Sequence, residues 1–415
     1  MVKNVRETIL LMILFVFVIL IVQFTGISRI KEKSSIEVPE TCNLLVRIDI
    51  KGLSKKILLS ELYSHRASEL FKDIYELGEL DDEFEKDSEN PFIEFSDNLK
   101  SISEPLEMLS INISGKDGVF LRALSQHKTS NSSLYSSNNN YLYVQLYGPT
   151  FKRQEILSAI NSSHKYKLSK APKSDIQIYE NTNNDLDLKG YVNTSSKNIM
   201  LHILHKSENQ LNEKIKAKGL HFYSGANHLT AINSMNPLKN KIKNFSMNYF
   251  GLNSYGNPIL FPNTDMLFEF EDSVNIDDLS SLMKSSFKSS VISVLSESKD
   301  SGTIKFDDVN LAYKIFNSNN IYISTNNRTM ELSETSGSIE LGGDLSQILK
   351  LNDKGWKGIL ANEMITGIPV LNELKMFLSQ LHPVTTHSEN ESIITLKLEG
   401  NQSIYSYLFS LLSKL

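Results

Sequence analysis

The chain has 415 residues, 43 Lys and Arg against 48 Asp and Glu, and a formal net charge of −5 at pH 7. Its length has room for two or three compact units, and an apolar fraction of 40% is enough to bury a sizeable core. The slightly acidic balance argues against a nucleic-acid-binding protein, because such proteins usually carry a basic footprint. We therefore expect no nucleic-acid partner.

The strongest signal is an apolar run near the start of the chain. Residues 9–22 are unbroken in apolar character, and residues 23–27 extend the run. At ~1.5 Å per residue, a helix over residues 9–27 spans roughly 28 Å, which matches the hydrocarbon core of a bilayer. We predict a transmembrane helix over residues 9–27, with residues 1–8 as a cytoplasmic tail and the lipid bilayer as a partner.

A cleaved signal peptide is the competing interpretation. Lys3 and Arg6 form a basic n-region, and Gly26-Ile27-Ser28 has a small-x-small pattern. The apolar run is longer than the ~7–15 residues usual in signal peptides, which favours an uncleaved signal-anchor. Basic residues flank the run on both sides, so charge alone does not decide its orientation. Because long C-terminal domains translocate largely regardless of flanking charge, we expect an extracytoplasmic, periplasmic C-terminal region in the cell envelope.

Cys42 is the only cysteine, so no intrachain disulfide can form. This suits a cytosolic protein, or a bacterial envelope protein that relies on a large core, better than a eukaryotic ectodomain. We expect Cys42 to act as a small apolar residue rather than as a nucleophile.

After the anchor, residues 28–39 are charged and aperiodic, and we interpret them as a juxtamembrane linker. Beyond them, a β-type run repeatedly leads through a short polar turn into a helical pattern. The predicted strands of these units are residues 44–50, 141–147, 199–204, 266–270 and 393–398. The predicted helices cover residues 59–77, 151–160, 207–217, 275–296 and 403–415. Their irregular spacing favours an ordinary α+β domain over an internal duplication.

The helix over residues 275–296 has the clearest signals. Asn275 is a suitable N-cap, and Asp277 and Asp278 fall in the first turn, where carboxylates favour the positive end of the helix dipole. Apolar residues then recur at three- and four-residue steps.

Further alternating runs predict strands between these units. They lie at residues 109–114, 119–125, 303–306, 311–316 and 321–325. Tight polar turns at residues 114–118 and 317–320 join several of them into hairpins. Exposed loops are expected at residues 81–90, 129–140 and 181–187. Gly and Pro cluster near residues 253–262, where we place a domain boundary.

The predicted fold class is α+β. One N-terminal transmembrane helix is followed by largely antiparallel sheets with strand-turn-helix units. The sheets are divided between subdomains at residues 40–255 and 256–415.

No stretch has the pattern of a metal site. The acidic run 81–89 lacks the alternating ligands and central Gly of an EF-hand loop, so a solvated loop is expected. His202 and His205 lie in a predicted strand, where their spacing places them on opposite faces and prevents them from sharing a metal on their own. His221 and His228 flank a turn-like stretch and are interpreted as surface or hydrogen-bonded histidines.

Patterns for catalysis and phosphate binding are missing from the sequence. It contains no Gly-x-Ser-x-Gly elbow, and Gly337, Gly342 and Gly343 do not form a phosphate loop. The aromatic segment 250–262 is either a recognition loop or, as we favour, a loop packed over the core. We therefore predict no catalytic residue, no cofactor and no metal.

Two stretches resemble uncharacterised, N-terminally anchored envelope proteins of the Bacteroidota. The first is Val38-Pro39-Glu40 ahead of a strand, and the second is Gly342-Gly343-Asp344-Leu345 ahead of Asn352-Asp-Lys-Gly-Trp-Lys-Gly358 and a helical end. The resemblance implies a periplasm-facing α+β domain without an assigned reaction or catalytic residues. The chain departs from the pattern at Thr41-Cys42 and lacks a lipidation cysteine.

Three functions are compatible with this sequence. The favoured one is a non-enzymatic envelope protein that binds a protein partner or acts as a scaffold. The second is a ligand-binding or sensory extracytoplasmic domain with a cleft near residue 255. The third is a divergent envelope hydrolase whose catalytic groups converge in space rather than in order.

Overall fold

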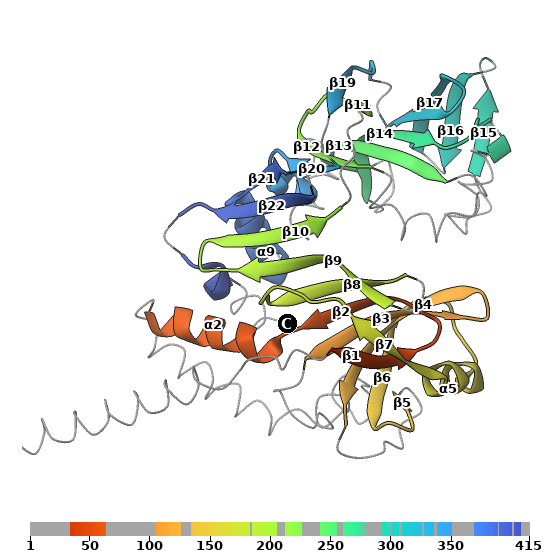
Figure 1. Cartoon of the computed structure of the whole chain (residues 1–415). Coiled ribbons are helices and arrows are strands. Elements are labelled where there is room, and N and C mark those ends of the chain that lie inside the picture. Colours follow the sequence, from red (N-terminus) through yellow and green to blue (C-terminus); the bar gives the residue numbers. More distant parts are fainter. Residues whose placement is uncertain are drawn as a thin grey trace, which may run out of the picture. The chain divides into compact units, whose positions relative to one another are not determined.

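The structure of the chain is a computed structural model. It describes residues 34–63, 105–125, 134–182, 185–205, 212–225, 241–254, 260–275, 277–278, 292–296, 298, 300–306, 309–325, 328–335, 338–350, 369–388, 390–400 and 402–407. These residues form mostly antiparallel sheets with few helices, in two compact units, Met1–Ser196 and Lys197–Leu415 (Figure 1). Within the described ranges, no helix has the length and apolar character needed to cross a bilayer. The expected span at residues 9–27 lies outside these ranges.

Unit 1 is built on one antiparallel sheet. Its strands lie in the order β9 (Asp185–Thr194), β8 (Ile176–Thr182), β2 (Cys42–Ile48), β3 (Leu106–Ile113), β4 (Lys116–Leu124), β6 (Tyr141–Tyr147) and β5 (Leu134–Ser136). Alternating apolar residues form these strands; in β3, for example, every second side chain is buried. The turn between β3 and β4 places Ser114 and Gly115 at φ 53° and 81°, the positive values that a tight hairpin turn requires.

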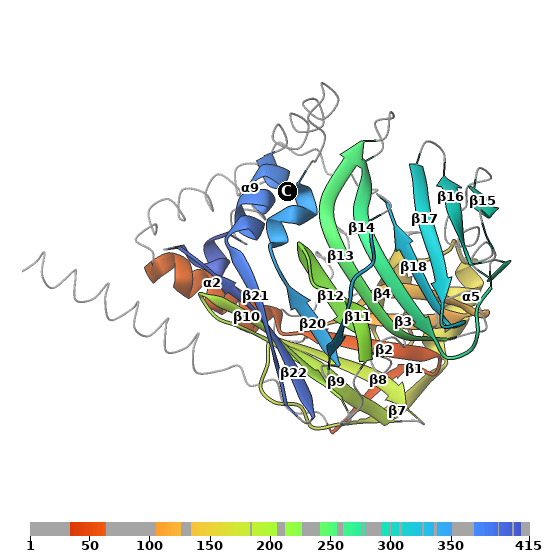
Figure 2. The same cartoon turned by 90° about the horizontal axis from the view of Figure 1, so that it is seen from above.

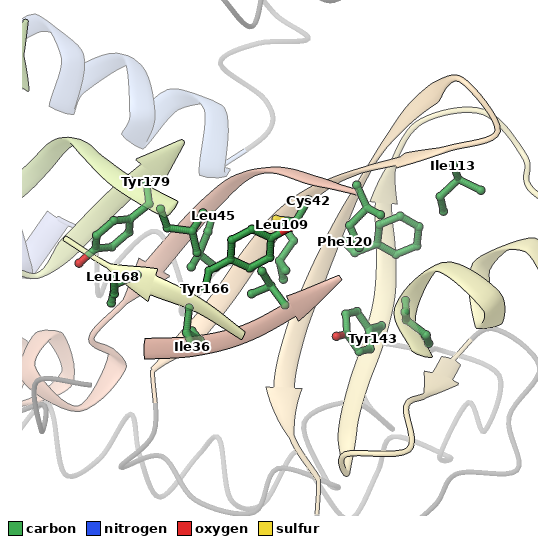
Figure 3. Packing of buried hydrophobic residues seen from close by; sticks show 14 of the residues in the cluster. Ile36, Cys42, Leu45, Leu109, Ile113, Phe120, Tyr143, Tyr166, Leu168 and Tyr179 are labelled. Atoms are coloured by element: carbon green, nitrogen blue, oxygen red, sulfur yellow. The ribbon is translucent and has the colours of Figure 1, made fainter. Parts of the chain in front are cut away.

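A second layer covers one face of this sheet. It contains β1 (Ser35–Pro39), which pairs antiparallel with β7 (Ser163–Leu168), and the helix α5 (Arg153–Asn161). β7 also continues the sheet through a short parallel pairing with β9. Figure 3 shows Ile36 of β1 and Tyr166 of β7 in the same core as Leu45 and Leu109 of the main sheet. The first strand that the structure describes, β1, is therefore part of the core of unit 1.

The helix α2 (Ile50–Tyr63) is joined to the sheet by a buried carboxylate. Asp175 is 5% exposed and accepts hydrogen bonds from Lys56 Nζ at 2.7 and 2.6 Å. The same carboxylate accepts from the Thr194 amide and hydroxyl at 2.6 and 2.8 Å. Asp175 thus connects α2 to the end of β9.

Unit 2 contains an eight-stranded antiparallel sheet (Figure 2). Its order is β15 (Ile292–Ser296), β16 (Ser301–Phe306), β17 (Val309–Phe316), β18 (Asn320–Ser324), β14 (Leu260–Phe270), β13 (Ile242–Ser254), β12 (Leu220–Ser224) and β20 (Ile339–Gly342). A separate ribbon pairs β11 (Asn212–Ile215) with β19 (Leu332–Thr335). The β17–β18 turn has Asn317 and Ser318 at φ 53° and 58°, again a tight hairpin.

A second strand group in unit 2 consists of β10 (Asn198–Leu204), β22 (Glu391–Leu398) and β21 (Leu381–His387). Its apolar face packs with α9 (Pro369–Ser379), the short helix η2 (Leu345–Leu349) and the helical residues 404–407. β21 faces the free edge of β20. There the Thr385 hydroxyl accepts from the Leu341 amide at 3.0 Å and donates to the Leu341 carbonyl at 2.9 Å. One side chain therefore satisfies both backbone groups at this edge.

All ten strands predicted from the sequence are confirmed, with shifts at their ends. β6 has the predicted bounds, and β2, β3, β4, β10, β14, β16, β17, β18 and β22 lie where alternation placed them. The helix expected at residues 151–160 is α5. Asn275 caps the turn that follows it, because its side-chain oxygen accepts from the amides of Asp277 and Asp278 at 2.8 and 3.0 Å.

Several expectations are corrected. Residues 35–39 of the predicted linker form β1, and Ile36 and Val38 are 5% and 0% exposed. The helix predicted at residues 207–217 is a strand, β11, in its described part, because residues 212–215 pair with β19. The far end of the helix predicted at residues 275–296 is β15, which pairs with β16.

Two predicted loops and the predicted boundary also differ from the structure. Residues 134–136 form β5, and Leu186 inside the second predicted loop is 0% exposed in β9. The Gly- and Pro-rich segment at residues 253–262 falls between and within the paired strands β13 and β14, whereas the chain passes from unit 1 to unit 2 between residues 196 and 197. Turn residues serve hairpins as readily as domain linkers, which explains the misplaced boundary.

Candidate functional site

Among the described residues, a dense group of Ser and His side chains lies in unit 2, and we name it the Ser392 cluster. It consists of Ser392, His205, His387 and Ser338. The Ser392 Oγ atom is 2.9 Å from His387 Nδ1, 3.1 Å from His205 Nε2 and 3.0 Å from Ser338 Oγ. Strand pairing creates this proximity, because β21 and β22 place His387 opposite Ser392, and the His205 amide bonds to the Asn390 carbonyl beyond β10.

Charged residues adjoin the Ser392 cluster. Glu340 on β20 forms an ion pair with Lys214 and accepts from the Thr335 hydroxyl at 2.6 Å. Burial of part of the ring lowers the pKa of His387; Glu340 opposes this shift, whereas His205 and Lys214 add to it. Burial acts to raise the pKa of Glu340, but the hydrogen bonds from Lys214 and Thr335 outweigh it, so the pKa lies below its ordinary value.

The two histidines singled out from the sequence do lie on opposite faces. His202 Nδ1 is 2.9 Å from Glu391 Oε1, whereas His205 contacts Ser392 on the other face. The expectation that they cannot share a metal follows directly from this geometry. Among the described residues, no three His, Cys, Asp or Glu side chains are grouped so that they could hold a metal ion.

A serine hydroxyl next to an imidazole is the pairing that activates a nucleophile in many hydrolases. Here the geometry works against that chemistry. Ser392 is 0% exposed, and its hydroxyl is surrounded by two imidazoles and the Ser338 hydroxyl. A substrate carbonyl cannot reach Oγ without opening of the strand ends. The hydrogen bonds of the cluster join β10, β21 and β22 to Ser338, the residue preceding β20.

Unit 1 contains a buried row of charges, which we name the Arg–Glu–Arg row. Arg47 on β2, Glu107 on β3 and Arg122 on β4 lie directly opposite one another and are 4%, 6% and 1% exposed. Glu107 accepts from Arg47 Nε at 3.3 Å and from Arg122 Nε and Nη2 at 2.9 and 2.5 Å. Removing Glu107 would leave two guanidinium charges without their counter-ion in a dry interior.

Arg122 has further partners that fix its position. It donates to the Glu37 carbonyl of β1 at 2.8 Å, and its guanidinium lies 4.3 Å from the centre of the Tyr141 ring. Burial disfavours the charged form, but Glu107 reverses this effect and holds the pKa of Arg122 above its ordinary value. The row therefore connects the main sheet to β1 as a structural network.

Cys42 is buried in the core of unit 1, as expected from the sequence. Burial raises the pKa of its thiol to about 12, with Arg122 opposing the shift. The thiolate is the reactive form of cysteine, so this side chain is inert in the folded protein.

The glycines considered for phosphate binding have packing roles where they are described. A Cβ atom on Gly342 would lie 2.5 Å from the ring of His221, and one on Gly343 would lie 2.0 Å from the Gly219 carbonyl oxygen. Gly343 also has φ 95°, which other residues rarely adopt. His221 is partly buried, and burial lowers its pKa. The remaining glycine, Gly337, lies outside the described residues.

The aromatic segment predicted at residues 250–262 belongs to the β13–β14 hairpin where it is described. Phe250 lies below the Arg328 guanidinium, with 3.9 Å between the guanidinium carbon and the ring centre. The acidic run 81–89 and His228 lie outside the described residues.

Sequence reasoning missed Ser392, His387 and the Arg–Glu–Arg row. One signal was present for Arg47. It shares the period-two register of the buried Leu45, so alternation alone places a charge on the inward face of β2. The Ser392 cluster carries no such signal, because its members come together only through long-range strand pairing.

The fold and these clusters define a class of protein. The chain is a mainly antiparallel β protein of two units, and the Ser392 cluster and the Arg–Glu–Arg row each join several of its described strands. No family model, no curated protein and no solved structure matches this chain.

Proposed function

We propose that the chain is a single-pass, membrane-anchored extracytoplasmic protein whose β-rich region is a non-enzymatic interaction or scaffold domain of a cell envelope. The observation that carries the proposal is the continuity between the apolar run and the fold. Residues 9–27 suit a bilayer span, and the structured strand β1 begins at Ser35 with Ile36 and Val38 in the core. A helix in lipid at residues 9–27 is thus attached to unit 1 by a short connection.

The length of this connection has a physical consequence. The six residues 28–33 between the apolar run and Ser34 reach at most ~20 Å when fully extended. A tether this short keeps unit 1 next to the bilayer surface, which suits a protein that acts on partners held in or near the same membrane.

The interior positions of the reactive side chains support an interaction role. Ser392 and Cys42 are each 0% exposed, and Arg122 is 1% exposed. By contrast, β6 ends in two exposed apolar side chains, Leu146 at 42% and Tyr147 at 71%. Exposed aromatic residues of this kind are frequent at protein–protein contacts.

Membrane attachment and topology are tested with the full chain. Lys314 is an exposed residue of β17, and Lys314→Cys introduces an accessible thiol. Cys42 can stay in place because its burial keeps it unreactive. We expect the protein to resist carbonate extraction and the new thiol to react with a membrane-impermeant maleimide in spheroplasts. Extraction by carbonate, or labelling only after lysis, contradicts the anchor or its orientation respectively.

The interaction role is tested by photo-crosslinking in intact membranes. A photoreactive amino acid at Tyr147 should give one discrete crosslinked band, whereas the same residue at the exposed Lys314 should give none. If the protein is correctly inserted but gives no crosslink from Tyr147, the exposed end of β6 no longer supports a partner-binding role.

A further inference from the structure

The exposed face of β7 carries a concentration of positive charge. Lys165 and Lys167 point outward and are exposed, while Tyr166 and Leu168 between and after them are buried. Two residues along a strand separate side chains on one face by ~7 Å. Lys170 follows the strand and is exposed as well. We name these three residues the β7 lysine face.

The local charge differs from that of the whole chain. Residues 163–173 contain four Lys and no Asp or Glu, although the chain has a net charge of −5. Within the described part of the chain, Lys165, Lys167 and Lys170 form no ion pair. Other lysines do find carboxylates, such as Lys214 with Glu340. The β7 lysine face therefore presents its charge to the solvent.

Three carboxylates lie near this face, and they do not neutralise it. Glu37 is opposite Lys165, but its Oε1 atom accepts from the Ser163 hydroxyl and the Asn139 amide, each at 2.6 Å. Asp185 is opposite Lys167 at the parallel β7–β9 pairing. Asp187 lies beside the face as well, because its Oδ1 atom accepts from the Ser169 hydroxyl at 3.0 Å. Lys173, which follows Lys170, is also exposed, so four ammonium groups against three carboxylates leave this region positive.

The chain enters the fold beside this face. The Ser34 carbonyl accepts from the Leu168 amide at 3.0 Å, and Ser35 pairs with Lys167. The connection to the apolar run therefore starts within one strand spacing of Lys167. Because that connection spans at most ~20 Å, an anchored chain keeps this edge of unit 1 close to the headgroups.

We infer that the β7 lysine face docks on the anionic headgroups of the membrane that holds the chain's own anchor. The inference rests on the proposed anchor and adds to it a defined orientation of unit 1. Ammonium groups near an anionic leaflet are attracted to its phosphates, and the attraction fades beyond the Debye length, ~10 Å at 0.1 M salt. The tether brings the lysines into this range.

The test uses the full chain reconstituted in nanodiscs of phosphatidylcholine alone or mixed with phosphatidylglycerol. Lysines are labelled with an amine reagent and quantified by mass spectrometry. Lys165, Lys167 and Lys170 should react severalfold more slowly in the anionic discs, and high salt should restore their reactivity. Lys305 and Lys314 are matched controls, because both are exposed strand lysines of unit 2, and their labelling should be equal in both discs.

Charge-reversal variants separate docking from anchoring. Lys165→Glu with Lys167→Glu should abolish the lipid-dependent protection of Lys170, whereas Lys305→Glu with Lys314→Glu should leave it intact. An inserted chain whose β7 lysines react equally in both discs refutes the docking alone. A chain that carbonate extracts from membranes refutes the anchor, and the docking inference falls with it.

Discussion

Replacing Glu107 by Gln is the sharpest test of the Arg–Glu–Arg row. The substitution keeps the shape of the side chain and removes the charge that faces two guanidinium groups. Glu107 accepts two hydrogen bonds from Arg122 and one from Arg47 in a site that is almost fully buried. Breaking a buried ion pair by removing one partner costs ~3–5 kcal/mol. The Gln carbonyl can still accept one of the hydrogen bonds, so we expect a loss near the lower limit, about 3 kcal/mol.

Hydrogen exchange measured by mass spectrometry is the suitable assay, because it reports each unit separately. A loss of about 3 kcal/mol corresponds to roughly hundredfold faster exchange of the most protected amides. This acceleration should appear in peptides from β3 and β4, while peptides from β16 and β17 in unit 2 stay unchanged. Glu331→Gln is the exposed control, since Glu331 pairs with Lys216 and Lys218 at the surface, and we expect it to leave exchange unaltered.

A compensating variant decides whether the unpaired guanidinium charges cause the loss of stability in Glu107→Gln. Replacing Arg47 and Arg122 by Met together with Glu107→Leu removes all three charges, and buried ion networks tolerate such apolar replacement. We expect this triple variant to be more stable than Glu107→Gln alone. If Glu107→Gln accelerates exchange less than fivefold, or if the triple variant is the less stable of the two, the row does not have the energetic role assigned to it.

Three further predictions concern unit 2. The free energy of unfolding should fall as the pH drops below about 6.5, because burial lowers the pKa of His387 and the unfolded chain therefore binds a proton at this position before the folded chain does. Denaturant titrations at several pH values should show a weaker pH dependence for His387→Asn. A pH dependence equal to that of the unchanged protein contradicts this. Thr385→Val should cost ~1–3 kcal/mol in the same titrations, because it leaves the Leu341 amide and carbonyl without the hydroxyl. Gly343→Ala should lower the thermal midpoint, because its Cβ would lie 2.0 Å from the Gly219 carbonyl oxygen; an unchanged midpoint contradicts this.

Local patterns were sufficient for much of the strand content. Residues 141–147 are a run rich in aromatic and apolar residues, and they form β6 with the same bounds; the polar residues 317–319 form the turn between β17 and β18. Both features depend on neighbours along the chain, namely a run of residues with high strand propensity and residues that tolerate positive φ. Such signals need no knowledge of the partner strand.

The misplaced elements depend on partners that are distant in the sequence. Residues 212–215 have a helical context but pair with β19, more than a hundred residues later. Residues 292–296 continue a helical pattern, yet Ile292 and Val294 also alternate as a strand does, and pairing with β16 decides the outcome. Tertiary pairing of this kind overrides local propensity.

The polar clusters show the same limit. Ser392 and His387 are five residues apart, and nothing in that spacing indicates that His205 joins them from β10. Buried charges are equally hard to infer, because Arg122 resembles any solvent-facing strand arginine until Glu107 is placed opposite it. The positions of the strands could therefore be predicted from the sequence, whereas the polar contacts between paired strands could not.

The position of β1 has a consequence for biosynthesis. During synthesis Ile36 and Val38 emerge early, but their partner strand β7 follows only after β2 to β6 and α5 have been made. Pairings between such distant segments form slowly, and the apolar residues that await them are prone to aggregation. The nascent chain is thus expected to require chaperone protection at least until residue 168 has left the ribosome, because β1 has no partner strand before β7 is complete.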